Sequence, residues 1–260
     1  MKCIIFTQDE RIYLPTAIEI VVRNLIDDIE CIILSPPMST HGGILAGLKK
    51  HIPVFGIKGS FYMGMMAILS KLGPLLRIKP IWSNFWSIEA IAKYFEIPVY
   101  KIADVNSEEM HSILDEKKAD LLISVSCPQV LEKTVLAKFK YGGINVHSAP
   151  LPKYRGLMPG FWVLYNGEKQ TAVTVHLLDD KLDNGDILLQ EPVEISPTET
   201  WNTLILKTKR TAGYILVKAV KKIKDGSVSY IPNRDDDATY YTFPTWREAR
   251  DFRKRGGRIF

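Results

Sequence analysis

Short apolar runs of strand composition alternate with segments of helical periodicity through the first two-thirds of the chain. The runs are rich in Val, Ile and Leu, have the length of buried strands, and cover residues 3–7, 30–34, 98–102, 121–125 and 143–146. Enough chain separates successive runs for helical crossovers, which join parallel strands. The alternation therefore predicts an α/β fold, with a mostly parallel sheet and helices on both of its faces.

The pattern changes in the last third of the chain. Two longer strands are expected at 171–178 and 186–195, with a polar turn between them. A helix is expected at 198–224, because apolar residues recur there at helical spacing. The residues after this helix are rich in Pro, Asp and Arg and too few for a core of their own. We expect one domain at 1–226 and a C-terminal extension at 227–260 that packs on it.

The composition is that of an ordinary soluble globular protein, with 46% hydrophobic and 24% charged residues. The formal net charge is +5, and residues 247–260 alone carry a net +4, so the rest of the chain is nearly neutral. A general nucleic-acid surface is therefore not expected. The three cysteines are scattered and lack metal-ligand spacing, which indicates a reducing, cytoplasmic environment and no metal site.

A strongly hydrophobic stretch lies at residues 59–78. Lys71, Pro74 and Arg77 interrupt it before it reaches the length of a membrane span, so no span is expected. A buried amphipathic helix is the leading interpretation, and contact with a membrane surface is the alternative. The methionines of this stretch, Met63, Met65 and Met66, are expected to pack in the core.

Two polar side chains stand at the end of the predicted strand 143–146. Asn145 and His147 are two residues apart, so they lie on the same side of the strand. Ligands of an open α/β sheet bind at the carboxyl ends of its strands. Acyl transfer needs a hydrogen-bond donor for the developing oxyanion and a group that handles a proton, and an amide with an imidazole supplies both. Structural roles for both residues remain open at this point.

A second polar segment interrupts the predicted hairpin. Residues 179–186 contain four aspartates, whereas a simple hairpin turn needs only one Asx-Gly pair. The excess of carboxylates favours a functional site that draws on both segments.

Several short motifs connect these segments in a fixed order between residues 120 and 227. They read Asn145-Val-His147, Leu151-Pro-Lys-Tyr-Arg-Gly156, Trp162, Asn166-Gly-Glu168, Thr174-Val-His176 and Leu182-Asp-Asn-Gly-Asp-Ile187. In content and order they resemble the folate-dependent formyltransferase family, which includes glycinamide ribonucleotide, methionyl-tRNA and sugar-nucleotide formyltransferases. The resemblance implies the Rossmann-like formyltransferase fold.

The same resemblance implies a catalytic set of Asn145, His147 and Asp183. Asn145 and a protonated His147 would stabilise the oxyanion, and Asp183 would orient His147 and keep it charged. The cosubstrate would be 10-formyltetrahydrofolate, whose formyl carbon the acceptor amine attacks directly, and no metal is required. The residues implied for folate binding are Ser124, Val125, Ser126, Cys127, Pro128, Val130, Leu178, Asp179 and Asp180.

The acceptor is expected to be a small amine, an amino sugar linked to a nucleotide. The loop at 7–14 replaces the Gly-rich first loop of the family, and a plain turn before a helix is the alternative interpretation of this loop. Residues 239–245 look like the ending of formyltransferase-like proteins associated with surface-sugar pathways. The substrate-binding candidates are Gln8, Asp9, Tyr13, Lys153, Tyr154 and Arg155.

Three other functions remain open. A hydrolase would release formate from the same folate, and a methionyl-tRNA formyltransferase-like enzyme would use another acceptor. That family carries a second basic domain, for which the residues after 226 are too few. A noncatalytic folate or nucleotide-binding module is disfavoured, because the three catalytic side chains are all present. The sequence leaves open whether the protein forms a homodimer.

Overall fold

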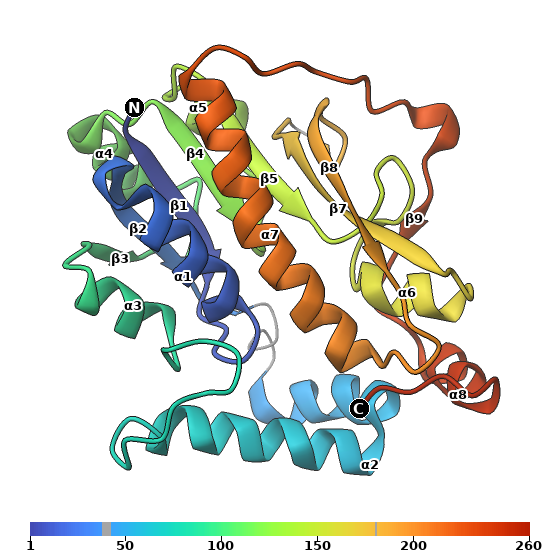
Figure 1. Cartoon of the computed structure of the whole chain (residues 1–260). Coiled ribbons are helices and arrows are strands. Elements are labelled where there is room, and N and C mark those ends of the chain that lie inside the picture. Colours follow the sequence, from blue (N-terminus) through green and yellow to red (C-terminus); the bar gives the residue numbers. More distant parts are fainter. Residues whose placement is uncertain (38–42, 180) are drawn as a thin grey trace.

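A seven-stranded sheet in the order β3-β2-β1-β4-β5-β7-β8 forms the centre of the molecule (Figure 1). This computed structural model describes residues 1–37, 43–179 and 181–260, with only the backbone described for 43–51. The strands are β1 (Cys3–Gln8), β2 (Ile29–Ser35), β3 (Val99–Lys101), β4 (Leu121–Val125), β5 (Gly143–His147), β7 (Gln170–Leu177) and β8 (Ile187–Glu194).

The first five of these strands pair in parallel, and the last two join the sheet antiparallel. The mostly parallel α/β fold predicted from the sequence is therefore confirmed. The strands begin and end within a few residues of the predicted runs. The hairpin of β7 and β8 forms one edge of the sheet, and its polar turn begins beside Gly143 at the start of β5.

Helices cover both faces of the sheet because its strands are apolar on both sides. In β1, Cys3 and Ile5 pack into one apolar cluster, whereas Ile4 and Phe6 pack into another. The first cluster lies under α1 (Leu14–Leu25), α3 (Ile88–Tyr94) and α7 (Trp201–Lys224), and the second under α4 (Glu108–Lys117) and α5 (Lys133–Leu136). The 3-10 turn η1 (Ile26–Asp28) connects α1 to β2.

The helix expected at 198–224 is α7, which begins at Trp201. Thr200 caps it: the Thr200 hydroxyl accepts from the Thr203 amide, and the Thr203 side chain bonds back to the backbone of Thr200. This reciprocal box satisfies amide groups that a helix N-terminus otherwise leaves without partners. The long apolar face of α7 then packs against α1 and the sheet.

Helix α2 (Gly43–Leu72) differs from the sequence-based expectation of a buried helix. It contains a kink at Gly56, whose φ of 68° is left-handed. Met66 is buried and Met63 half-buried, but Met65 is exposed. Among the described residues, one stretch, Ile52–Leu72, is long and apolar enough to cross a membrane. Only 22% of the most apolar part of this stretch is buried. The prediction of a buried helix was therefore wrong for one of its faces.

The C-terminal extension crosses from the end of α7 to the far side of the molecule (Figure 1). It contributes η3 (Asp235–Asp237), β9 (Tyr240–Tyr241) and α8 (Trp246–Lys254). Strand β9 pairs in parallel with β6 (Arg155–Gly156), and the Trp162 indole of α6 (Pro159–Tyr165) donates to the Thr242 carbonyl over 2.9 Å. The buried side chains of α8 belong to an apolar cluster shared with α2 and α6. The boundary at residue 226 stays a prediction.

Candidate active site

Asn145 and His147 lie at the carboxyl end of β5, on the same side of the strand, as their spacing predicts. Antiparallel pairing places His176 of β7 opposite Asn145 and Thr174 opposite His147. Asn145 is half-buried, whereas His147 and His176 are buried. Four polar side chains from two strands therefore meet at one end of the sheet.

Asp183 reaches this group from the turn between β7 and β8. Its own φ of 51° is left-handed, and two residues later a Cβ on Gly185 would lie 2.1 Å from the Leu177 carbonyl oxygen. Only glycine allows so close an approach, which folds the turn tightly back over the hairpin. The Asp183 carboxylate consequently lies 3.5 Å from His147 Nδ1 and 3.6 Å from His176 Nε2.

His176 is a member of the group that the predicted site did not include. Its Nδ1 lies 2.7 Å from the Leu177 carbonyl oxygen, which can only accept, so Nδ1 carries the hydrogen of the neutral ring. Its Nε2 then accepts from the Asn145 amide at 3.1 Å. The Thr174-Val-His176 motif, with the same two-residue spacing as Asn145 and His147, was the signal in the sequence.

His147 is held from both sides. Its Nε2 lies 2.7 Å from the Tyr154 carbonyl oxygen and therefore donates to it, which leaves Nδ1 toward Asp183. Burial lowers the pKa of His147 below its ordinary value, and the negative charge of Asp183 only partly opposes this effect. The lowered pKa favours a neutral His147, whereas the resemblance implied a protonated one, and the Nε2 hydrogen of this ring is directed at the Tyr154 carbonyl.

Asp183 is a fixed negative charge. Burial alone would raise its pKa, but the neighbouring imidazoles of His147 and His176 and a 2.9 Å hydrogen bond from the Gly156 amide together hold the pKa well below its usual range. A proton bound to His147 Nδ1 would lie directly beside this carboxylate. The group can thus take up a proton and stabilise the imidazolium that forms.

The lowered pKa of His147 predicts a pH dependence of stability. The unfolded chain takes up a proton near the ordinary pKa of 6.5, and the folded site resists it. Stability is therefore complete above that pH and is lost as the pH falls through the folded pKa. We expect the Tm to fall less between about pH 7 and 5 in His147→Gln than in the wild type. Thermal melts measure this, with His111→Gln on α4 as the control; identical pH profiles for the wild type and His147→Gln would contradict the assignment.

The two segments implied for folate binding both reach the apolar cluster under α4 and α5. Cys127 and Leu178 pack against one apolar cluster, and the Leu178 amide donates to the Gly143 carbonyl over 2.8 Å. Ser124 and Val125 are buried in β4, and Val130 is exposed. The predicted residue Asp180 lies outside the described residues. A folate-binding role for this surface stays a prediction.

Lys209 of α7 adds a positive charge to this region that the sequence did not single out. Its Nζ donates to the Ser126 hydroxyl over 2.8 Å, and Ser126 has a left-handed φ of 55°. Burial lowers the pKa of Lys209 to about 8, against the opposing charge of Glu10. Burial also raises the pKa of Cys127, which disfavours a nucleophilic thiolate there.

The residues predicted to bind the acceptor differ in whether their side chains already bond within the protein. Lys153 is exposed, and Asp9 lies 3.5 Å from Arg11 Nε in the loop after β1, where Gln8 ends the strand. Three others are engaged inside the protein: the Tyr13 hydroxyl donates to Asn202, the Tyr154 hydroxyl donates to Glu168, and the fully buried Arg155 bonds to the C-terminal extension. Tyr13, Tyr154 and Arg155 thus already have partners within the protein, and a direct acceptor contact by any of them stays a prediction.

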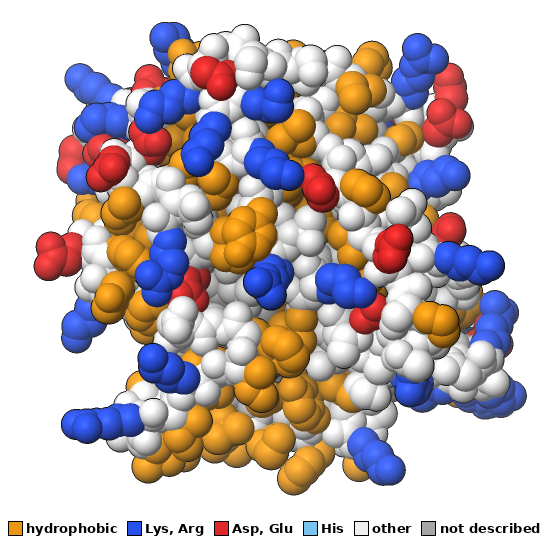
Figure 2. Space-filling model, viewed as in Figure 1, with side chains coloured by type: hydrophobic (Ala, Val, Ile, Leu, Met, Phe, Trp, Pro, Cys, Tyr) orange, Lys and Arg blue, Asp and Glu red, His pale blue; other side chains and the backbone are white. Residues whose placement is uncertain are grey.

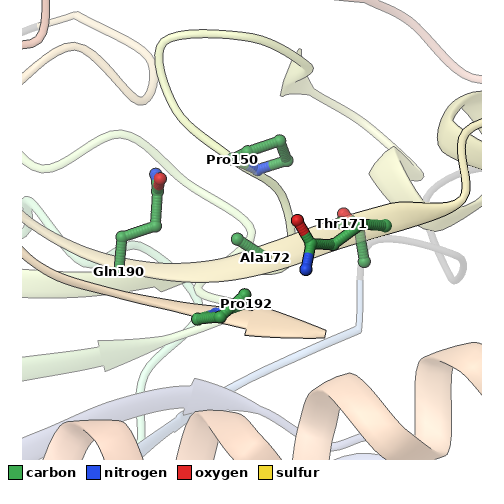
Figure 3. A pocket seen from close by; sticks show the side chains of 6 residues that line it. Pro150, Thr171, Ala172, Gln190 and Pro192 are labelled. Carbon is green, nitrogen blue, oxygen red and sulfur yellow. The ribbon is translucent and has the colours of Figure 1, made fainter. Parts of the chain in front are cut away.

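A hollow of about 210 Å³ opens beside the loop that follows β5 (Figure 3). Its lining is Pro150, Gln170, Thr171, Ala172, Gln190 and Pro192. The Gln190 amide donates to the Leu151 carbonyl and to Thr174, so the hollow adjoins the strand pair that carries His147. It contains none of the three predicted catalytic residues.

The fold and this site define an α/β protein equipped for oxyanion stabilisation and proton transfer. The family described as formyl transferase matches residues 87–220, which is more than half of the chain. The chain belongs to the formyl transferase family.

Two curated relatives illustrate the sequence similarity. The chain is 36% identical to the methionyl-tRNA formyltransferase of Kosmotoga olearia over 153 residues, which cover 59% of the chain and 49% of that relative. It is 34% identical over 157 residues to the bifunctional polymyxin resistance protein ArnA of Wigglesworthia glossinidia brevipalpis. The matched residues cover 60% of this chain and 24% of that relative. The chain thus spans about half the length of the first of these relatives and less of the second.

Solved structures share the fold at low identity. The sugar 3N-formyltransferase WlaRD, solved with dTDP and 5-N-formyl-THF, has a TM-score of 0.58 and 17% identity, covering 93% of this chain and 69% of its own. The phosphoribosylglycinamide formyltransferase of Anaplasma phagocytophilum has a TM-score of 0.60 and 16% identity. The match covers 93% of this chain and 98% of that enzyme. These likenesses support the Rossmann-like formyltransferase fold.

Proposed function

We propose that this protein transfers a formyl group from 10-formyltetrahydrofolate to a primary amine. The observation that carries the proposal is the meeting of Asn145, His147 and Asp183, with the Asp183 carboxylate 3.5 Å from His147 Nδ1. Membership of the formyl transferase family supports the same reaction. A purely structural role would not require three such side chains from two distant segments at one strand end.

In the proposed reaction the amine nitrogen attacks the formyl carbon and forms the new C–N bond. The carbonyl electron pair moves to oxygen, where the Asn145 amide donates a hydrogen bond; one of its two hydrogens is directed at His176, and the second can serve the oxyanion. His147 accepts the amine proton, and Asp183 stabilises the imidazolium. Collapse of the tetrahedral intermediate breaks the bond to N10 of the folate, which receives the proton.

The folate would lie against the loop after β4 and the turn after β7, the segments that contain Ser126 and Asp179. The backbone geometry of these segments supports the placement: Ser126 has a left-handed φ, and Asp179 shapes its turn by accepting from Asn184 and from the Lys181 amide. Lys209, held by Ser126, would add a positive charge beside the anionic cosubstrate.

The acceptor that we favour is an amino sugar linked to a nucleotide. A formyltransferase of Helicobacter canadensis, solved with folinic acid and dTDP-3-aminofucose, shares the fold over the whole of this chain with a TM-score of 0.59 and 15% identity. A methionyl-tRNA acceptor is the second candidate, because relatives with that name share 36% identity with this chain over its matched part.

The acceptor experiment uses purified protein, 10-formyltetrahydrofolate and one amine at a time. We expect tetrahydrofolate to form in step with an N-formylated amino-sugar nucleotide, identified by mass spectrometry. Charged initiator tRNA and glycinamide ribonucleotide are tested in parallel, and a reaction without amine measures hydrolysis. Preferred formylation of methionyl-tRNA would overturn the sugar acceptor. Steady formate release without any amine would identify a hydrolase, and folate binding without turnover would identify a noncatalytic module.

A further inference from the structure

The second half of α2 presents an apolar stripe to solvent. Its members recur every three or four residues, so they share one helical face. Phe61 is 74% exposed, and Ile57, Met65, Ile68 and Leu72 are exposed as well. Leucine, isoleucine and phenylalanine are among the residues most often buried, so a row of five in solvent is unusual.

The exposed apolar surface continues beyond the end of the helix. Leu75 is 79% and Ile81 83% exposed, and Leu76, Ile78 and Trp82 are also exposed. Together with the stripe of α2 these residues form what we call the α2 patch. Figure 2 shows hydrophobic side chains gathered along the lower part of the molecule, where α2 lies in Figure 1.

The opposite face of α2 is fixed to the domain. The Phe55 ring lies 5.1 Å from that of Trp201, and the Tyr62 ring lies 4.7 Å from that of Phe260. At the C-terminal end of α2, a Cβ on Gly73 would lie 2.5 Å from the Trp86 indole. The end of the helix and this indole are therefore in close contact. With one face packed and the other exposed, the helix is arranged to lie along an apolar boundary rather than to cross it.

The chain segment that carries the α2 patch has charges of a single sign, and the nearby Glu19 of α1 is buried under Ser83 and Asn84. The sequence contains no aspartate or glutamate between residues 31 and 88. The described basic residues of this segment, Lys58, Lys71, Arg77 and Lys79, are all exposed. A two-fold dimer through this face would oppose the same cations across its interface, which is unfavourable. An anionic surface complements both the apolar side chains and the basic ones.

We propose that the α2 patch docks the protein on the surface of an anionic lipid bilayer. The side chains of Phe61, Ile68 and Ile81 enter the boundary between headgroups and acyl chains, and Trp82 lies at headgroup level. Lys71 and its basic neighbours contact the lipid phosphates. Docking involves neither the folate nor the acceptor, so it stands or falls apart from the proposed transfer reaction.

Vesicle flotation tests the proposal with the full chain. We expect the protein to float with vesicles of phosphatidylcholine and phosphatidylglycerol at low salt and to bind vesicles of phosphatidylcholine alone far more weakly. Phe61→Ser with Ile68→Ser should reduce the bound fraction by roughly tenfold or more, because apolar area no longer enters the bilayer. Lys71→Gln with Arg77→Gln should weaken binding to the anionic vesicles only.

Matched variants elsewhere on the surface keep the test specific. Tyr214→Ser removes an exposed aromatic of α7, and Arg250→Gln with Lys254→Gln removes charge from α8; both should bind as the wild type does. Circular dichroism verifies that each variant folds. Absence of flotation, or flotation that depends on the α8 cations alone, overturns the proposal. Loss of a dimer in sedimentation velocity upon Phe61→Ser, without any vesicle binding, would assign the patch to a second copy of the chain.

Discussion

Asp183→Asn is expected to lower kcat for formyl transfer by at least about a hundredfold while the affinity for folate stays close to that of the wild type. The asparagine keeps the shape of the side chain and removes its charge. The imidazolium of His147 then forms without its counter-charge, and an amide nitrogen can face Nδ1 where a carboxylate oxygen stood. Steady-state kinetics with the identified acceptor, and folate titration by fluorescence, separate the two effects.

Asp186→Asn is the matched control, because Asp186 lies in the same turn with its side chain exposed. It should retain the wild-type rate within about threefold, as surface changes usually do. Titration of the histidines by NMR adds a readout that a merely structural role would not move: the pKa of His147 should fall further in Asp183→Asn, since the opposing charge is gone. A kcat within tenfold of wild type, in a variant with an unchanged Tm, would remove Asp183 from the mechanism.

The sequence predicted those parts of the site that depend on local geometry. Asn145 and His147 share a side because strand residues alternate, and their place at the end of β5 follows from the alternation of strands and helices. The approach of Asp183 has no such local cause. It depends on the close contact of Gly185 with Leu177. The four aspartates pointed to the turn, and only the family resemblance singled out Asp183.

The structure was least predictable where distant segments supply the partners. His176 reaches Asn145 through strand register, which the sequence of either strand alone does not specify. Tyr13 lies in a polar loop and suggested a ligand contact, but its hydroxyl bonds to Asn202 of α7. The apolar stretch at 59–78 suggested a buried helix, and periodicity could not show that nothing in the described part of the chain covers its outer face.

Arg155 shows how such a distant contact can control the site. Its side chain is fully buried, although the sequence suggested a substrate contact in a loop. The guanidinium donates to Asn184 at 2.8 Å, to Asn233 at 2.8 Å and to Asp235 at 2.7 Å, and also to the Tyr240 hydroxyl. It therefore joins the turn of the predicted catalytic aspartate to the C-terminal extension. The Asn233 amide closes the network by donating to the Asp183 and Gly185 carbonyls.

Arg155→Met is consequently expected to destabilise the protein by roughly 3 kcal/mol, because it removes a buried charge-assisted network and leaves the oxygens of the buried Asn233 without their donor. For a chain of this size the Tm should fall by roughly 6–12 °C. The turn next to Asn184 also loses its anchor, so kcat should fall with it even at temperatures where the variant is folded. Calorimetry and kinetics on the same preparation measure both effects.

Arg210→Met, which replaces an exposed arginine of α7, should change neither the Tm nor kcat. Arg155→Lys should recover only part of the loss, since one ammonium cannot reproduce the planar fork that reaches Asn184, Asn233 and Asp235 together. A Tm within about 2 °C of wild type for Arg155→Met would show that the extension is held mainly by its apolar contacts.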